Sequence, residues 1–503
     1  MRASSRGPRP GSPALRLPLL PRLPLLAVLA LSTALPGRAA LANDRVDFEL
    51  TPDPRLLESV DPARAGRMAE LGSTAERIRG LKLVNRPPWL VKSPREVYAF
   101  MLRGIQAEAT PREVELATKL YAAFGFWKPD FDLLSAQLDS LSGAVRAFYN
   151  RTDDDFTLVR AAGPGRTGLG RGMDSEEEAE VVHEYTHALQ AHSGLMAGLP
   201  MAGGNDRSQA SRALVEGDAV LAMSVQLVES STGRQGADPA AVGRVLGMIR
   251  MSMASMIQSP LLRKYPPVIG ASLIFSYTGG SSFAEAAYKR GGWAEVNGCY
   301  AVPPLSTEQI IHPEKYFLPV PEDPVHIEPP DVRAALLPGA QIVDLDALGE
   351  MEITVLLAGF VPQAEARRSA AGWGGELYAA FERTAGPRRG EMALAWLTVW
   401  DTEADAAEFF ESYSKALDRK CGLERRTVKA GELLDWRGPG AARESRLERR
   451  GLAVLSVEGA DELETAALAA HFWSLKRSPP PPRRRAAPAA PVGPLAPAAP
   501  IAP

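Results

Sequence analysis

Apolar and polar positions between residues 54 and 143 follow helical spacing, which predicts mainly helices in this part of the chain. Ser93 is a suitable N-cap for a helix over about 94–106. Pro111 suits the first turn of another helix, because its missing N–H removes no hydrogen bond there. A third helix is expected over about 132–141.

The pattern then changes to two short strands within residues 147–160, on either side of a polar turn at 150–155. The next helix is expected over about 175–193, where Ser175 and Glu178 have the spacing of a capping box.

Two more helices are expected over about 208–230 and 239–258. The second contains four methionines whose spacing fits core packing better than a soft-metal site: Met248, Met251, Met253 and Met256.

Residues 331–477 mix helical and strand patterns, which predicts a smaller α+β domain. Helices are expected over about 350–359, 362–371, 403–417 and 461–473. Strands are expected at 376–382, 392–400, 425–434 and 452–457. Three tryptophans fit core positions better than a ligand platform: Trp396, Trp400 and Trp473. This region offers no catalytic constellation, so we expect an accessory domain that could bind a protein partner.

The two ends of the chain differ from the rest. Basic residues, an apolar run from Leu23 to Leu35 and an A-x-A site ending at Ala42 predict a cleaved secretory signal over 1–42. The run is shorter than the ~20 residues that span a bilayer, so no stable membrane span is expected. The protein is therefore expected in the periplasm or outside the cell. The tail at 478–503 is rich in Pro, Ala and Arg and is expected to be disordered.

Chain length, net charge and cysteine content bear on the number of domains, the class of partner and the possible disulfides. With 503 residues, two or more domains are expected, and a formal net charge of -3 gives no argument for a nucleic-acid partner. In an exported protein, Cys299 and Cys421 could form one long-range disulfide, although the sequence cannot show that they meet.

Residues 183–190 read His-Glu-Tyr-Thr-His-Ala-Leu-Gln, the HExxH arrangement. On a helix, His183 and His187 lie on one face, one turn apart, and can bind the same metal ion. Glu184 is turned away by about 100°, which lets it act as a base on a water without binding the metal. The alternative is an exposed, charged turn of a helix.

A catalytic zinc site needs a third protein ligand. The metzincin position is Ser193, which excludes that branch. Glu216 lies in an otherwise apolar stretch, where an ionised carboxylate requires a cation. A zinc ion would meet that need, and a salt bridge to Arg212 is the alternative.

The HExxH motif together with Glu216-Gly217-Asp218-Ala219 resembles the gluzincin clan of zinc metallopeptidases, and residues 130–316 resemble predicted exported bacterial proteins of this type. The resemblance implies an α+β chain. Its mainly helical zincin-like domain over 43–330 has a helical part at 43–143 and a small edge sheet. It also implies one zinc ion bound by His183, His187 and Glu216.

The chain departs from thermolysin-like members at Val220, where they place an aspartate that orients a ligand histidine. Asp218 is only a weak candidate for that role. As in other zincins, the strand at 156–160 is expected to be the edge that binds an extended peptide.

The mechanism expected from these parts uses zinc to acidify a water, with Glu184 as the base that passes the proton to the leaving amine. His312 is a candidate oxyanion stabiliser, and Tyr277 and Tyr300 are alternatives. The function expected is an exported zinc metallopeptidase. A non-catalytic envelope binding protein and a hydrolase of non-peptide amides remain open as alternatives.

Overall fold

The computed structural model describes residues 62–159, 172–201, 205–331, 336–438 and 444–483. The expected signal peptide at 1–42 and residues 484–503 of the expected tail lie outside these ranges. The chain has a mixed α+β fold with a large antiparallel sheet in its C-terminal part. In the described part of the chain, no helix is long and apolar enough to cross a membrane.

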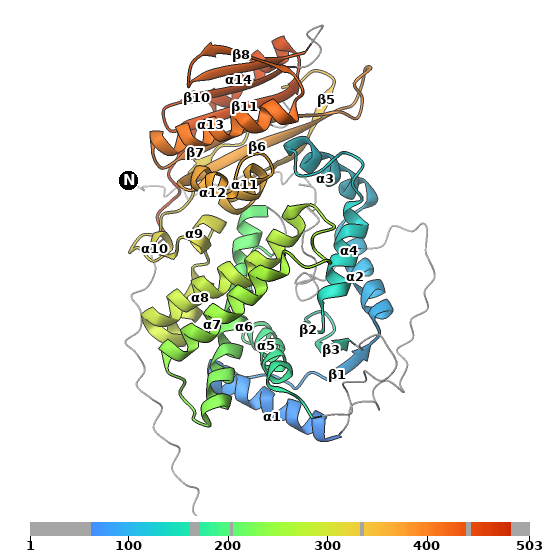
Figure 1. Cartoon of the computed structure of the whole chain (residues 1–503), viewed down its shortest axis with the longest axis vertical. Helices are drawn as coiled ribbons and strands as arrows, with labels where there is room; N and C mark the ends of the chain where they lie inside the picture. Colours follow the sequence, from blue (N-terminus) through green and yellow to red (C-terminus); the bar gives the residue numbers. More distant parts are fainter. Residues whose placement is uncertain (1–61, 160–171, 202–204, 332–335, 439–443, 484–503) are drawn as a thin grey trace, which may run out of the picture.

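Helices dominate the part of the chain before residue 317 (Figure 1). The elements are α1 Pro62–Arg79, β1 Trp89–Lys92, α2 Pro94–Glu108, α3 Pro111–Phe124, α4 Leu133–Ala144, β2 Ala147–Asn150, β3 Asp155–Val159, α5 Ser175–His192, α6 Asn205–Thr232, α7 Pro239–Met256, α8 Pro267–Ala301, α9 Thr307–Ile311 and α10 Pro313–Tyr316.

The expected helix starts are confirmed at Ser93 and Pro111, and α5 begins at Ser175 as expected, but its N-cap is one residue earlier than predicted. Its N-cap is Asp174, whose side chain accepts hydrogen bonds from the backbone N–H groups of Glu176 and Glu177. The prediction of Ser175 as the cap was wrong, because a carboxylate at 174 satisfies two free N–H groups of the first turn.

The small sheet has the order β1-β3-β2, with β1 parallel and β2 antiparallel to β3. β3 is therefore the central strand, and the prediction that residues 156–160 form an edge was wrong. The parallel neighbour β1 was not expected, since it has only four residues and lies far from β3 in the sequence.

Helices α6 and α8 pack with their backbones in close contact. A Cβ atom added at Gly217 would lie 2.0 Å from the carbonyl oxygen of Gly280, and one added at Gly280 would lie 2.0 Å from that of Ala213. Only glycine permits this approach. The contact brings α8 against the part of α6 that contains Glu216.

The prediction that the α7 methionines fill a core was wrong, and the disulfide that the sequence left open between Cys299 and Cys421 does not form. The α7 methionines do not fill a core: Met248, Met251 and Met256 are 59%, 71% and 38% exposed. Cys299 and Cys421 are free thiols. The Cys299 Sγ donates to the Glu295 carbonyl within α8, whereas Cys421 follows α13 and lies 3.4 Å from the Ser445 hydroxyl.

The C-terminal part forms a seven-stranded sheet in the order β5-β6-β7-β11-β10-β9-β8. Its elements, with the short pair β4 and β12, are β4 His326–Ile327, β5 Ala340–Asp346, α11 Gly349–Ala358, α12 Gln363–Ala370, β6 Trp373–Arg383, β7 Met392–Trp400, α13 Glu403–Lys420, β8 Glu424–Lys429, β9 Leu433–Arg437, β10 Glu444–Arg450, β11 Ala453–Ala460, α14 Glu462–Ser474 and β12 Arg477–Ser478.

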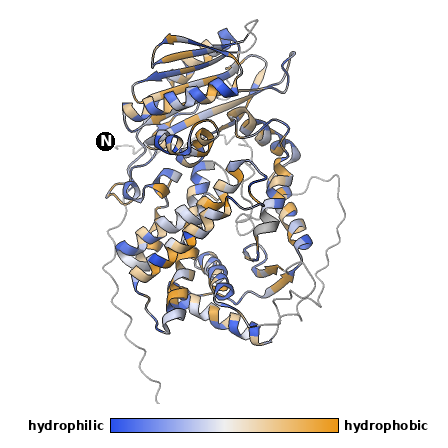
Figure 2. Ribbon diagram, in the orientation of Figure 1, coloured by the Kyte–Doolittle hydropathy of each residue, from blue (hydrophilic) through white to orange (hydrophobic). Residues whose placement is uncertain are grey.

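One face of this sheet packs on α13 and the other on α14. Figure 2 shows hydrophobic positions along the strands and hydrophilic positions on the outward side of α13. The tryptophans predicted to be in the core are there: Trp396, Trp400 and Trp473 are at most 9% exposed.

The same core extends into the N-terminal helices. The ring of Phe124 in α3 lies edge-on to Tyr378 and Trp396 of the sheet, with centroids 5.0 and 5.4 Å apart. Residues on either side of the expected domain boundary at 330/331 therefore share one apolar cluster. The first residues of the expected tail are also ordered against the rest, because Arg483 binds Asp323.

Candidate metal centre

Three potential metal ligands converge between α5 and α6. The Nε2 atoms of His183 and His187 are 3.1 Å apart, and they lie 3.3 and 3.1 Å from the two carboxylate oxygens of Glu216. All three side chains are buried, and their ligand atoms lie within 4.8 Å of one another. The structure thus brings together the residues that the sequence nominated as metal ligands.

The chemistry of this donor set fits a zinc ion. Glu216 is 0% exposed, and among the residues that the structure describes neither of its oxygens has a hydrogen-bond partner that satisfies normal geometry. A buried, ionised carboxylate in that position is costly unless a cation neutralises it. Two imidazoles and one carboxylate are the ligands of one class of catalytic zinc site.

The alternative partner of Glu216 does not bind it. Arg212 donates from Nη2 to the Ser208 hydroxyl at 2.7 Å, one turn earlier on α6. Burial lowers the pKa of Arg212 to about 10, and the negative charges that oppose this effect belong to Glu108 and Glu352. The salt-bridge explanation for Glu216 therefore loses its support.

Glu184 lies beside the cluster and is 7% exposed. Its Oε2 accepts a hydrogen bond of 2.8 Å from the backbone N–H of Tyr149 in β2. Burial raises the pKa of Glu184 to about 7, although the neighbouring histidines oppose the shift. A carboxyl group with this pKa can both accept and release a proton near neutral pH.

The ligand side chains are strongly coupled when no cation lies between them. Burial acts to lower the pKa of His187, but the charge of Glu216 outweighs it and raises that pKa to about 9. Burial acts to raise the pKa of Glu216, and here His187 and His183 prevail and lower it to about 2. A proton on His187 thus stabilises the negative charge of Glu216, as a bound metal ion would.

Of the three candidates for stabilising an oxyanion, only Tyr277 lies at the cluster. Its ring, on α8, stacks on His183 with centroids 6.1 Å apart. Burial raises the pKa of Tyr277 well above its usual value, and the charges of Glu216 and Glu184 raise it further. The hydroxyl is therefore a proton donor at any physiological pH.

The other two candidates have different partners. The Nε2 atom of His312 lies 3.0 Å from Glu350 of α11, and its Nδ1 lies 3.5 Å from Glu314. Tyr300 donates to Asp218, behind the metal ligands. The sequence favoured His312 over the tyrosines, whereas the contacts favour Tyr277. Tyr277 lies near His183 because it is on the long helix α8, which was not predicted from the sequence.

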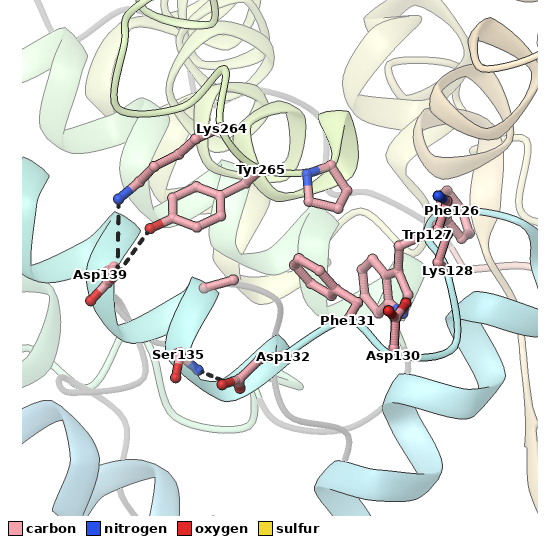
Figure 3. Close-up of a pocket in the computed structure, with 12 residues that line it drawn as sticks. Phe126, Trp127, Lys128, Asp130, Phe131, Asp132, Ser135, Asp139, Lys264 and Tyr265 are labelled. Atoms are coloured by element: carbon pink, nitrogen blue, oxygen red, sulfur yellow. Dashed lines mark hydrogen bonds and ion pairs between the residues drawn. The ribbon is translucent and has the colours of Figure 1, made fainter.

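Two other features, a surface cavity and a second group of carboxylates, share no residues with this centre. A cavity of about 600 Å³ lies between the start of α4 and the start of α8 and is lined by aromatic rings such as Trp127, Phe131 and Tyr265 (Figure 3). A second group of carboxylates, Glu308, Glu322 and Asp401, surrounds the ammonium group of Lys315.

Comparisons with known proteins concern the C-terminal part alone. Residues 340–469 match a family described as "Domain of unknown function (DUF8575)". This segment runs from β5 into α14 and does not include the three ligands. No curated protein and no solved structure gives a significant match.

Proposed function

We propose that this protein is a zinc-dependent metallopeptidase with a zincin-like, gluzincin-type site. The observation that carries the proposal is the convergence of His183, His187 and Glu216, whose buried ligand atoms all lie within 4.8 Å of one another. Glu184 completes the arrangement, because its carboxyl group lies beside the ligands without being one of them.

One zinc ion bound by these three residues would polarise a substrate carbonyl and acidify a water. Glu184 takes the proton from that water and gives it to the leaving amine, in keeping with its pKa of about 7. The N–H of Tyr149 holds the carboxylate in place for both transfers. Tyr277 donates a hydrogen bond to the oxygen that gains negative charge.

The substrate proposed is a peptide or protein, and the part after residue 331 is an accessory domain open to a protein partner. The proposed location is the periplasm or the cell exterior, on the basis of the sequence of residues 1–42.

The test compares zinc content and hydrolysis of a denatured protein by the chain from Asn43 onward with two variants, Glu184→Gln and Glu216→Ala. We expect about one zinc in the wild type, a loss of 10²–10⁴-fold in kcat with zinc retained in Glu184→Gln, and loss of zinc in Glu216→Ala.

Glu352→Gln is the matched control, since Glu352 is equally buried but accepts a hydrogen bond from Tyr121. It should retain zinc and activity. Wild-type protein without zinc would refute the proposal, and zinc without hydrolysis of any peptide would favour the non-catalytic binding protein or a non-peptide amide substrate.

A further inference from the structure

A buried chain of polar side chains leads away from one metal ligand. His187 Nδ1 lies 2.9 Å from Gln190 Oε1, and Gln190 Nε2 lies 3.0 Å from Asp218 Oδ2. Gln190 and Asp218 are both 0% exposed. No solvent can replace these contacts, so the orientation of each group is set by its protein neighbours.

The neighbours of Gln190 decide which way its amide points. Its Nε2 atom is also 2.9 Å from the carbonyl oxygen of Val215 and 3.0 Å from the Tyr300 hydroxyl. The carbonyl and the Asp218 carboxylate can only accept hydrogen bonds. The amide nitrogen must therefore lie on that side, and the amide oxygen must face His187. Because that oxygen can only accept, His187 must donate from Nδ1.

The tautomer of His187 follows from this argument. With the proton on Nδ1, the lone pair of a neutral imidazole is on Nε2, the atom that faces His183 and Glu216. This is the form that binds a metal ion. Within the described ranges, His183 Nδ1 has no hydrogen-bond partner, so the two histidine ligands are not held equally.

The far end of the chain is anchored by an ion pair between α6 and α1. Arg79 Nε lies 2.8 Å from Asp218 Oδ1, and both side chains are completely buried. Arg79 also donates to Asn297, and its guanidinium lies 4.2 Å from the centre of the Trp293 ring. Tyr300 donates to Asp218 at 2.8 Å. Asp218 is thus held by Arg79 and Tyr300 while it accepts from Gln190.

We propose that Gln190 is a positioning residue that holds His187 in its metal-binding tautomer and orientation, and that the Asp218–Arg79 pair holds Gln190. The inference rests on the proposed zinc site and deepens it. Asp218 was a weak candidate in the sequence because it is two residues after Glu216 and points away from it on a helix. Gln190 bridges that distance, since it contacts both His187 and Asp218. Helix α1 thereby becomes part of the support of the metal site.

The test is Gln190→Met in the chain from Asn43 onward, which keeps the length of the side chain and removes both hydrogen-bonding groups. The control is Gln226→Met, which replaces a glutamine on α6 that is 3% exposed and outside the chain of contacts. Zinc affinity is measured by competition with a chelator, and the ligand geometry by the visible spectrum of the Co²⁺-substituted protein. Melting of the metal-free proteins reports any general loss of packing.

We expect Gln190→Met to bind zinc about 10–100-fold more weakly and to change the Co²⁺ spectrum, whereas Gln226→Met leaves both unchanged. Tyr300→Phe removes a single hydroxyl that contacts both Asp218 and Gln190 Nε2, and it should weaken zinc binding measurably but by less than about tenfold. It carries the test if Gln190→Met does not fold.

The outcomes separate this inference from the proposed function. Normal zinc affinity and a normal Co²⁺ spectrum in Gln190→Met and Tyr300→Phe would overturn the positioning role and leave the metallopeptidase proposal standing. Equal losses in Gln190→Met and Gln226→Met would also overturn it, since they would indicate packing alone. Absence of zinc from the wild type would overturn both.

Discussion

Replacing Gly217 with alanine should separate α6 from α8 beside the metal ligands. The new Cβ would lie 2.0 Å from the carbonyl oxygen of Gly280, whereas ordinary contacts of a Cβ atom begin at 3.4 Å. The obstacle is backbone and cannot rotate away, so the helices must move apart by more than an ångström.

The expected cost follows from two opposing effects. Overpacking of a core costs about 1–3 kcal/mol, and a backbone clash belongs at the upper end of that range or above it. Alanine in a helix interior is more stabilising than glycine by about 1 kcal/mol, which offsets part of this cost. We therefore expect Gly217→Ala to lower the free energy of unfolding by about 2 kcal/mol.

Gly298→Ala is the matched control, because Gly298 lies on α8 and nothing is within 4 Å of its added Cβ. It should leave stability unchanged or raise it by up to about 1 kcal/mol. Urea unfolding of the metal-free proteins measures the difference, and chelator competition measures zinc affinity. Gly217→Ala should also bind zinc more weakly, since Glu216 is the adjacent residue. Equal stability of the two variants would show that the close helix contact is not required.

Two further predictions concern the metal-free protein and the cysteines. The folded-state pKa of His187, raised to about 9 by the charge of Glu216, is above the usual 6.5 of a histidine. Its stabilising effect is therefore complete below pH 6.5 and is lost as pH rises through 9. Urea unfolding of metal-free protein should therefore show stability falling by up to about 3 kcal/mol between pH 6.5 and 9, and a flat profile would contradict the coupling of His187 to Glu216. Thiol titration without reductant should count two free thiols in denaturant, and Cys299 should react slowly in the folded protein because it is buried. A count of zero in denaturant would contradict the separation of the two cysteines.

Local signals in the sequence were sufficient for much of this architecture. Helices begin at Pro94 and Pro111 because capping side chains and proline act within one turn, and strands at 147–150 and 155–159 follow from local composition. The one-residue error at Asp174 arose because two adjacent residues could each serve as a cap, and only hydrogen-bond geometry distinguishes them.

Most residues of the candidate metal centre could also be nominated from the sequence, for a physical reason. His183, Glu184 and His187 lie on one helix, whose periodicity alone places the two imidazoles together. Glu216 could be nominated because a carboxylate in an apolar stretch needs a cation.

The sequence by itself thus determined the helices and strands that have strong local signals. It also nominated the histidines and carboxylates that are unusual on buried helices. Tertiary structure alone decided that β3 is central, that Tyr277 rather than His312 lies at the proposed metal ligands, and that the two thiols stay apart. It also decided that Gln190 and Asp218 connect His187 to Arg79. These features depend on contacts between residues up to a hundred or more positions apart. Such contacts are set by the packing of whole helices, above all by the approach of α6 and α8 at Gly217 and Gly280, which no short window of sequence encodes.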